Sequence, residues 1–275
     1  MPSPDPVTKQ RFIACGMYAF TDDLRSAWQS LFDLFFQNFE APCPVDPVLR
    51  FESGEKLIRD PQLLIGQTCG YPLVSQLSDV VTPVCVPLFD VAGCEGKNYS
   101  SRLIVSESSD IESLSDCYQG IAAINTSDSN SGMNVLRHAI APLSQAKPYF
   151  SAVRETGSHL KSLTEVAEGK VQIAAIDAVS FSFIQNAWPE LVARVRSIGY
   201  TAKTCGLPFV IPQEISKQLD SDDITACLNE ATLRLPEPIQ QHLHLRGFEG
   251  VDMDEYQGVL DLETVAQQAG YSQLN

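Results

Sequence analysis

The sequence is poor in basic residues. Among its 275 residues, Lys and Arg number 19 against 34 Asp and Glu, which gives a formal net charge of −15 and an isoelectric point near 4.6. Nucleic-acid-binding proteins neutralise phosphates with a basic surface, and adhesion to anionic membranes depends on the same charge. The composition therefore excludes a nucleic-acid partner and attachment to an anionic lipid surface.

Long apolar runs are also lacking. No stretch approaches the roughly 18 apolar residues that a membrane-spanning helix needs, so we expect no insertion into a membrane. The first residues, Met-Pro-Ser-Pro-Asp-Pro, lack the basic start and the apolar stretch of a secretory signal. We expect a periplasmic protein if a leader has been removed, and a cytoplasmic protein otherwise.

Familiar catalytic and metal-binding motifs are missing as well. The sequence has no GxxxxGK[ST] phosphate loop, no GxSxG elbow and no HExxH pair, and its eight cysteines include no CxxC. Cysteines such as Cys15 and Cys85 lie in apolar segments, which favours buried free thiols, with disulfides as the alternative. We predict no metal, no cofactor and no catalytic residues.

What is present is an alternation of short apolar strands with helices. Such alternation predicts an α/β architecture with mostly parallel sheets flanked by helices. Hydrophobic residues make up 44% of the chain, enough for a core. Strands are expected over 11–17, 63–67, 80–89, 102–105, 121–124, 150–154, 172–176, 194–200 and 208–211. Helices are expected over 21–36, 110–117, 132–145, 159–168, 178–186, 222–235 and 254–269, so that the last 60 or so residues are mainly helical.

The helix expected over 21–36 carries the strongest local signal. Thr21 is placed to cap it, and Asp22 and Asp23 suit the positive end of the helix dipole. Apolar side chains then recur at helical spacing, which predicts one buried face. The members of this stripe are Leu24, Ala27, Trp28, Leu31, Phe32, Phe35 and Phe36.

Two extended segments, 86–100 and 196–207, have the character of crossings between lobes. They predict one lobe made of 1–90 plus 200–275 and a second lobe over 98–196. A cleft between lobes is where small ligands tend to bind.

The segment 123–137 is the most informative for function. A strand is followed by Ser129, Asn130, Ser131 and Gly132, where a helix begins. Free backbone N–H groups at a helix start, with hydroxyls beside them, form an anion site, and glycine lets a ligand approach the backbone closely. The alternative is an ordinary capped loop, because Ser, Asn and Gly are also good turn residues.

Two further junctions carry candidate ligand groups. His159 begins a helix and could donate a hydrogen bond to an oxyanion, or it could be a surface or capping histidine. Asp177 ends a strand, which is where ligand-contacting groups lie in open α/β sheets. Its alternative role is to cap the following helix.

These residues also carry a family resemblance. The run from Tyr99 to Asp177 resembles the phosphate/phosphite/phosphonate-binding components of ABC importers, which are type II periplasmic-binding-protein-like and two-lobed. The matching pieces are Tyr99-Ser-Ser-Arg-Leu-Ile-Val, Ser129-Asn-Ser-Gly132, Gly157-Ser-His159, Glu168-Gly-Lys-Val and Ile176-Asp177. The resemblance implies that Ser129, Asn130, Ser131 and Gly132 bind the oxyanion and that His159 and Asp177 complete the pocket. It also implies that Tyr18 and Tyr71 close on the ligand from the other lobe.

The resulting hypothesis is a solute-binding protein that closes two lobes around a small phosphorus oxyanion for ABC-type uptake. Its partners would be a phosphonate, phosphate or phosphite ligand and an ABC permease. Two alternatives stay open. One is a cytoplasmic enzyme on the same fold, acting on a small anionic cofactor precursor, with His159 and Asp177 as an acid/base pair. The other is a ligand-sensing module.

Overall fold

The computed structural model describes residues 10–143 and 148–274, which fall into two compact units. The first unit comprises the chain up to Thr68 together with Leu77–Leu88 and Leu207–Asp252. The second comprises Cys69–Gln76, Phe89–Gly206 and the chain from Met253 onward. Residues 1–9, on which the expected lack of a signal rests, lie outside the described residues, as do 144–145 at the end of one expected helix.

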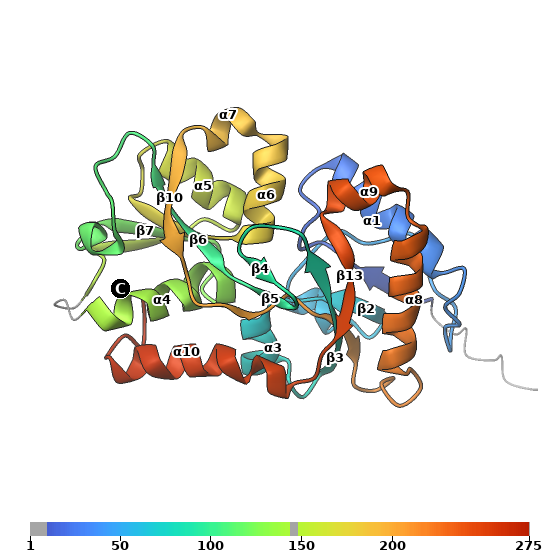
Figure 1. The fold of residues 1–275 in the computed structure, drawn as a ribbon. Coiled ribbons are helices and arrows are strands. Elements are labelled where there is room, and N and C mark those ends of the chain that lie inside the picture. The colour runs from blue at the N-terminus through green and yellow to red at the C-terminus, as the bar shows by residue number, and fades with distance from the viewer. Residues whose placement is uncertain (1–9, 144–147, 275) are drawn as a thin grey trace, which may run out of the picture. The chain divides into compact units, whose positions relative to one another are not determined.

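The first unit is built on a five-stranded sheet with the order β1-β2-β12-β3-β13. β1 pairs with β2 in parallel, whereas β12 runs antiparallel to both β2 and β3. Its strands are β1 (Phe12–Ala14), β2 (Leu63–Gln67), β3 (Val81–Phe89), β12 (Phe209–Pro212) and β13 (Leu245–Gly250). Its helices are α1 (Asp22–Phe35), α2 (Glu55–Ile58), α8 (Ser221–Arg234) and α9 (Glu237–Leu243), which can be followed in Figure 1.

Helix α1 forms as its sequence predicts. The Thr21 hydroxyl accepts a hydrogen bond from the Leu24 amide at 3.2 Å, which satisfies one of the amides left open at a helix start. The predicted apolar stripe is buried except for Phe36, which lies just past the helix and is partly exposed. Phe32 contacts Phe209 of β12 at 5.8 Å between ring centroids, so the stripe packs on the sheet of this unit.

The second unit also has a five-stranded sheet, with the order β10-β6-β9-β7-β8. β7 pairs in parallel with β8 and β9, and β6 runs antiparallel to β9 and β10. The strands are β6 (Ser101–Ser106), β7 (Ile121–Ile124), β8 (Ala152–Glu155), β9 (Ile173–Asp177) and β10 (Val195–Tyr200). A smaller sheet joins β4 (Cys94–Glu95), β5 (Asn98–Tyr99) and β11 (Thr204–Cys205).

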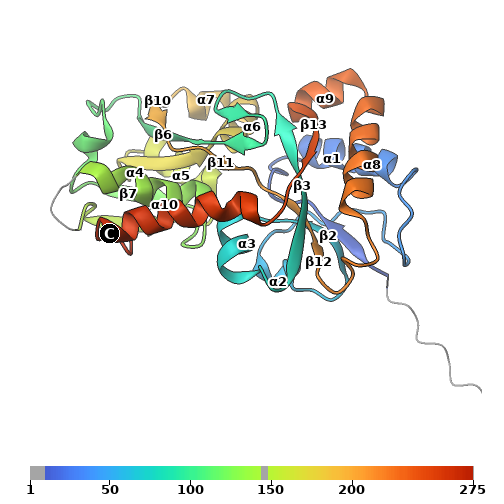
Figure 2. The same cartoon turned by 60° about the horizontal axis from the view of Figure 1, so that its bottom comes forward.

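Helices cover both faces of this five-stranded sheet. On one face α5 (His159–Ala167), α6 (Ala178–Ala187) and α7 (Pro189–Val192) enclose a core with Ile104 and Ile176. On the other face, α4 (Val135–Ile140) and α10 (Gln257–Gln268) pack on residues such as Val105 and Ala175. Figure 2 shows α10 running beside α4 and beside α3 (Gly70–Gln76). Short 3-10 turns at Leu114–Cys117, Ala141–Leu143 and Asp254–Tyr256 complete the unit.

The α/β class is confirmed, while several details differ from expectation. The sheets are mixed rather than mostly parallel, and the expected helix over 110–117 is reduced to one 3-10 turn. The C-terminal part is mainly helical as expected, but it also contributes the unpredicted strand β13 to the sheet of the first unit. Helix 132–145 begins as a π-turn at Asn130–Asn134 before becoming α4.

The division into units also differs from the predicted lobes at several segments, one of which is 200–206, expected in the first lobe but part of the second unit. The chain from Met253 onward, expected in the first lobe, belongs to the second unit. The physical reason is that α10 buries Val259 and Ala266 and accepts a hydrogen bond from Asn134 of the second unit. Residues 69–76 belong there as well, because Tyr71 packs on the same core.

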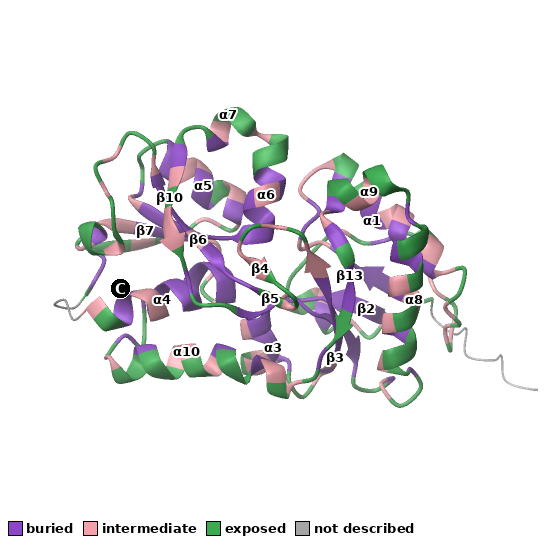
Figure 3. Cartoon of the chain, viewed as in Figure 1, coloured by how far each residue is buried: buried purple, intermediate pink, exposed green. Residues whose placement is uncertain are grey.

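Burial follows the sheets, as Figure 3 shows, with exposed residues on the outer faces of the helices. All eight cysteines are free thiols, and five of them are buried, including Cys15 and Cys85 as expected. Among the described residues, no helix is long and apolar enough to cross a membrane.

Candidate functional site

The predicted serine-rich loop forms the start of a helix in the second unit. The Ser129 hydroxyl accepts a hydrogen bond from the Gly132 amide at 3.0 Å, as an N-cap does. The Asn134 amide donates to the Ser129 carbonyl at 3.0 Å, which makes this first turn a wider π-turn. The side chains of Ser129, Asn130 and Ser131 are all buried. The loop therefore holds buried hydroxyl and amide groups at the start of the helix that follows β7.

The backbone N–H of Asn130 points at a residue from another segment. It donates to the Cys69 Sγ atom at 3.4 Å, and Cys69 lies directly before α3. Burial raises the pKa of the Cys69 thiol above its ordinary value, while backbone N–H groups of Asn130, Tyr71 and Ser131 act in the opposite direction. A backbone N–H of the helix start thus meets the Cys69 sulfur, a neutral acceptor, directly before α3.

His159 meets this loop from α5. Its Nε2 atom lies 2.8 Å from the Ser131 hydroxyl, and Ser158 caps the helix by accepting from the Lys161 amide at 3.2 Å. Burial lowers the pKa of His159 to about 4, so the imidazole is neutral near pH 7. The Nδ1 atom is buried and has no hydrogen-bond partner among the described residues. If Nε2 carries the proton, it donates to Ser131 and leaves the hydroxyl proton for another acceptor.

Asp177 is a helix cap. It ends β9, is 1% exposed, and its Oδ1 atom accepts from the Ser180 amide at 2.8 Å at the start of α6. Its neighbour across the sheet is Ser101, whose hydroxyl donates to the Ser131 carbonyl at 2.8 Å. Burial, and to a smaller extent the charge of Asp177, raises the pKa of Cys69. The carboxylate therefore lies within electrostatic reach of the loop while also serving as a cap.

The two predicted tyrosines belong to different units. Tyr71 belongs to the second unit, where its hydroxyl donates to Glu263 Oε1 of α10 at 2.7 Å. It therefore does not approach from the other lobe, and the reason is its ring contact with the core beneath α4 and α10. Tyr18 is in the first unit and is 2% exposed. Its contact with a ligand stays a prediction.

Gly132 is required for a reason that the sequence did not show. A Cβ atom built on it would lie 1.9 Å from Asn125 Oδ1, far inside contact distance. The missing side chain lets Asn125 pack against the helix start, so packing already requires a glycine here, and the close approach of a ligand stays a prediction.

Four residues of the site were not predicted. They are Cys69, Tyr99, Asn134 and Thr204. Cys69, Tyr99 and Thr204 are distant from the loop in the sequence, whereas Asn134 lies on its buried inner face. The Asn130 Nδ2 atom donates to Thr204 Oγ1 at 2.9 Å and to the Tyr99 hydroxyl at 3.2 Å. Tyr99 stood in the segment that carries the family resemblance, but Thr204 carries no local signal.

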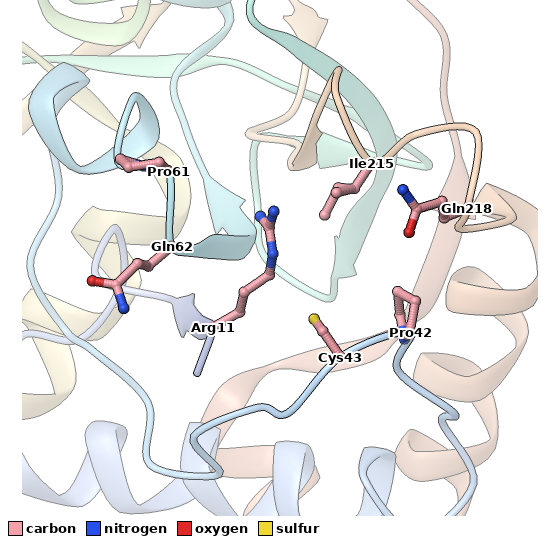
Figure 4. A pocket seen from close by; sticks show the side chains of 7 residues that line it. All are labelled: Arg11, Pro42, Cys43, Pro61, Gln62, Ile215 and Gln218. Atoms are coloured by element: carbon pink, nitrogen blue, oxygen red, sulfur yellow. The ribbon is translucent and has the colours of Figure 1, made fainter. Parts of the chain in front are cut away.

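Elsewhere the first unit has a hollow of about 360 Å³ beside β1 (Figure 4). Arg11 lies in it, but its guanidinium already donates to Glu214 at 2.8 Å and to the Leu63 carbonyl at 2.6 Å. Among the described residues there is no group of His, Cys, Asp and Glu side chains that could hold a metal ion. The polar cluster around Asn130 is therefore the candidate site.

The fold is that of the type II periplasmic binding proteins. The sequence model for the family "ABC transporter, phosphonate, periplasmic substrate-binding protein" matches residues 19–256. The chain belongs to this family of substrate-binding components of ABC transporters. By sequence, no protein with a curated description matches it.

Solved structures agree on the fold. A binding component of an ABC phosphonate transporter from Pseudomonas aeruginosa has a TM-score of 0.73 at 17% identity, covering 96% of this chain and 89% of that one. PhnD1 from Prochlorococcus marinus, solved with methylphosphonate, has a TM-score of 0.71 at 13% identity, covering 95% and 99%. The aliphatic sulphonate-binding protein SsuA from Escherichia coli has a TM-score of 0.59 at 15% identity, covering 94% and 88%.

Proposed function

We propose that this chain binds a small phosphorus oxyanion (a phosphonate, phosphate or phosphite) at the Ser129–Gly132 loop of the second unit. The observation that carries the proposal is the meeting of this helix start with His159, whose Nε2 atom lies 2.8 Å from Ser131 Oγ. Hydroxyl, imidazole and amide groups suit an oxyanion, because each can donate a hydrogen bond without needing a counter-charge. Family membership supports the same ligand class.

Net charge does not oppose this proposal. The chain carries −15, but exposed charges more than about 10 Å away are largely screened at ordinary salt. The groups at the loop act at contact distance. Asp177 is the nearby exception, and it suits a ligand that keeps a P–OH proton or carries an amino group.

Isothermal titration with methylphosphonate, phosphate and phosphite tests the proposal. Ser131→Ala removes one hydroxyl donor and should weaken binding about tenfold or more, because a hydrogen bond to a charged group is worth about 1.5–3 kcal/mol. Ser127→Ala, an exposed serine of the same loop, is the matched control and should bind like the unchanged protein. Absence of heat with every oxyanion, in protein freed of ligand, would refute the proposal.

We further propose that binding occurs without turnover and that an ABC permease receives the ligand in the periplasm. The family supports this, since its members are periplasmic binding components of transporters. Phosphorus NMR of methylphosphonate incubated with the protein should show the ligand unchanged, whereas an enzyme would convert it. Closure of the two units on the ligand stays a prediction, which a decrease in the radius of gyration on ligand addition would support.

A further inference from the structure

Behind the loop, three buried side chains form a continuous hydrogen-bonded row, which we term the amide relay (Arg137, Asn134 and Asn130). Arg137 Nη2 donates to Asn134 Oδ1 at 2.9 Å, and Asn134 Nδ2 donates to Asn130 Oδ1 at 3.0 Å. The three residues are 3%, 0% and 0% exposed. The relay therefore runs from a cation to the loop through a region closed to solvent.

The chemistry of its neighbours fixes the direction of the relay. A guanidinium can only donate hydrogen bonds, so Asn134 must turn its Oδ1 atom toward Arg137. On its other side, Asn134 Nδ2 donates to the Val259 carbonyl at 3.0 Å, and a carbonyl can only accept. A donor-only group and an acceptor-only group thus hold the Asn134 amide in one orientation.

The orientation of Asn134 decides that of Asn130. Because Asn134 donates to its Oδ1 atom, Asn130 turns its Nδ2 atom to Tyr99 and Thr204. Each of these hydroxyls accepts a hydrogen bond from the amide and so keeps its own proton for another acceptor. If the side-chain amide of Asn130 were turned around, its Oδ1 atom would accept hydrogen bonds from both hydroxyls, and neither proton would be left for another acceptor.

Arg137 itself is held in place by the C-terminal helix. Its Nη2 atom also lies 3.1 Å from Glu263 Oε1, and Glu263 accepts from the Tyr71 hydroxyl as well. A second bond runs from Arg137 Nη1 to the Ser272 carbonyl at 2.9 Å. Helix α10 therefore anchors the end of the relay that lies farthest from the loop.

We propose that Asn134, oriented by Arg137, is a positioning residue for the oxyanion site. It fixes the orientation of the Asn130 side-chain amide, so that the Tyr99 and Thr204 hydroxyl protons are directed toward the bound anion. This inference rests on the proposed function and adds to it. Neither Asn134 nor Arg137 touches the ligand; both act through Asn130. With this relay, uncharged groups donate hydrogen bonds to the anion, although the Asp177 carboxylate lies nearby.

The test compares variants that change the relay with one that only loosens its helix. Asn134→Leu keeps a similar volume, adds no charge and removes the donor to Asn130. Ile140→Ala is the control, because Ile140 is 0% exposed on the same helix and lies outside the relay. In a second pair, Arg137→Lys keeps a donor-only group and Arg137→Met removes it. Affinity for methylphosphonate is measured by isothermal titration, and stability by urea unfolding.

We expect Asn134→Leu to weaken methylphosphonate binding about 100-fold, since two hydrogen bonds to a charged ligand are lost and each is worth about tenfold or more. Ile140→Ala should stay within about threefold of the unchanged protein even if it unfolds more easily. Arg137→Lys should bind more tightly than Arg137→Met. Side-chain amide NMR should show a changed Asn130 signal in Asn134→Leu.

Two results would overturn the inference while leaving the proposed function in place. One is unchanged affinity in Asn134→Leu; the other is an equal loss in Ile140→Ala, which would make the effect one of helix stability. If the unchanged protein binds none of the oxyanions, the proposed function fails, and the inference fails with it.

Discussion

The buried imidazole of His159 predicts a specific dependence of stability on pH. Burial lowers the pKa of His159 from an ordinary 6.5 to about 4 in the folded protein. Between these two values the unfolded chain holds a proton on this residue that the folded protein does not. The free energy of unfolding therefore rises with pH across this window, at about 1.4 kcal/mol per pH unit.

The magnitude follows from the size of the shift. A difference of about 2.5 pKa units, at about 1.4 kcal/mol per unit, amounts to about 3 kcal/mol. The sign is that of a base whose folded pKa is depressed. His159 imposes no such loss above its unfolded pKa, and the loss grows as the pH falls from 6.5 to about 4. A loss of this size is a large part of the stability of an ordinary domain.

The assay compares the unchanged protein with His159→Gln, which is neutral at every pH and can still bond to Ser131. Urea unfolding is measured at several values from about pH 7.5 to about pH 4, and the two free energies are subtracted at each. Carboxylates titrate in both proteins and cancel in the difference. His138, whose pKa burial also lowers, cancels in the same way.

The difference should move by about 3 kcal/mol in favour of His159→Gln as the pH falls through this window. Two parallel curves would refute the reasoning, because they would mean that His159 titrates alike in the folded and unfolded chains. A movement in the opposite direction would mean that the folded protein stabilises the charged imidazole, and the neutral state of His159 beside Ser131 would have to be abandoned.

The other stability predictions concern packing. Gly132→Ala should destabilise the protein by about 1–3 kcal/mol, as overpacked sites do. Gly258→Ala, where an added Cβ meets nothing within 4 Å, should be neutral or stabilising, and chemical unfolding separates the two. Phe32→Ala should cost about 3–5 kcal/mol because the ring is fully buried, while Leu233→Ala, at a side chain 84% exposed, should change the unfolding free energy by less than about 0.5 kcal/mol. Equal effects within either pair would contradict the packing argument.

The proposed site would let an acidic protein hold an anion. Its hydrogen-bond donors are neutral, and their usefulness depends on which way each proton points. A buried cation, Arg137, orients two amides in succession, and a neutral imidazole bonds to Ser131. Fixed donors of this kind cost little reorganisation when a ligand arrives, which is the physical benefit of preorganisation.

Local patterns in the sequence were sufficient for several elements. The spacing of apolar residues and the Thr21 cap predicted α1, because a helix brings residues three and four apart to one face. The Ser129–Gly132 loop was predicted as a helix start from the same kind of short-range signal. Asp177 was left between a ligand role and a cap, and the cap is present in the structure.

Contacts between distant residues were beyond these patterns. Thr204 meets Asn130 from 74 positions away, and Val259 meets Asn134 from 125 positions away. Tyr71 was expected opposite the loop, yet its hydroxyl bonds to Glu263, 192 positions along the chain. No local period encodes such pairs, because they depend on how helices and strands from distant parts of the chain pack together.

The acidic character, the α/β class, the capped helix α1 and the chemical nature of the loop can all be read from the sequence. These follow from composition and from interactions within one or two turns of chain. By contrast, the packed fold was needed to learn that α10 and Tyr71 belong to the unit carrying the loop, and that Cys69, Tyr99 and Thr204 surround Asn130. The reason is that burial and hydrogen-bond satisfaction are properties of the whole packed unit, in which each buried amide must find a partner wherever the chain supplies one.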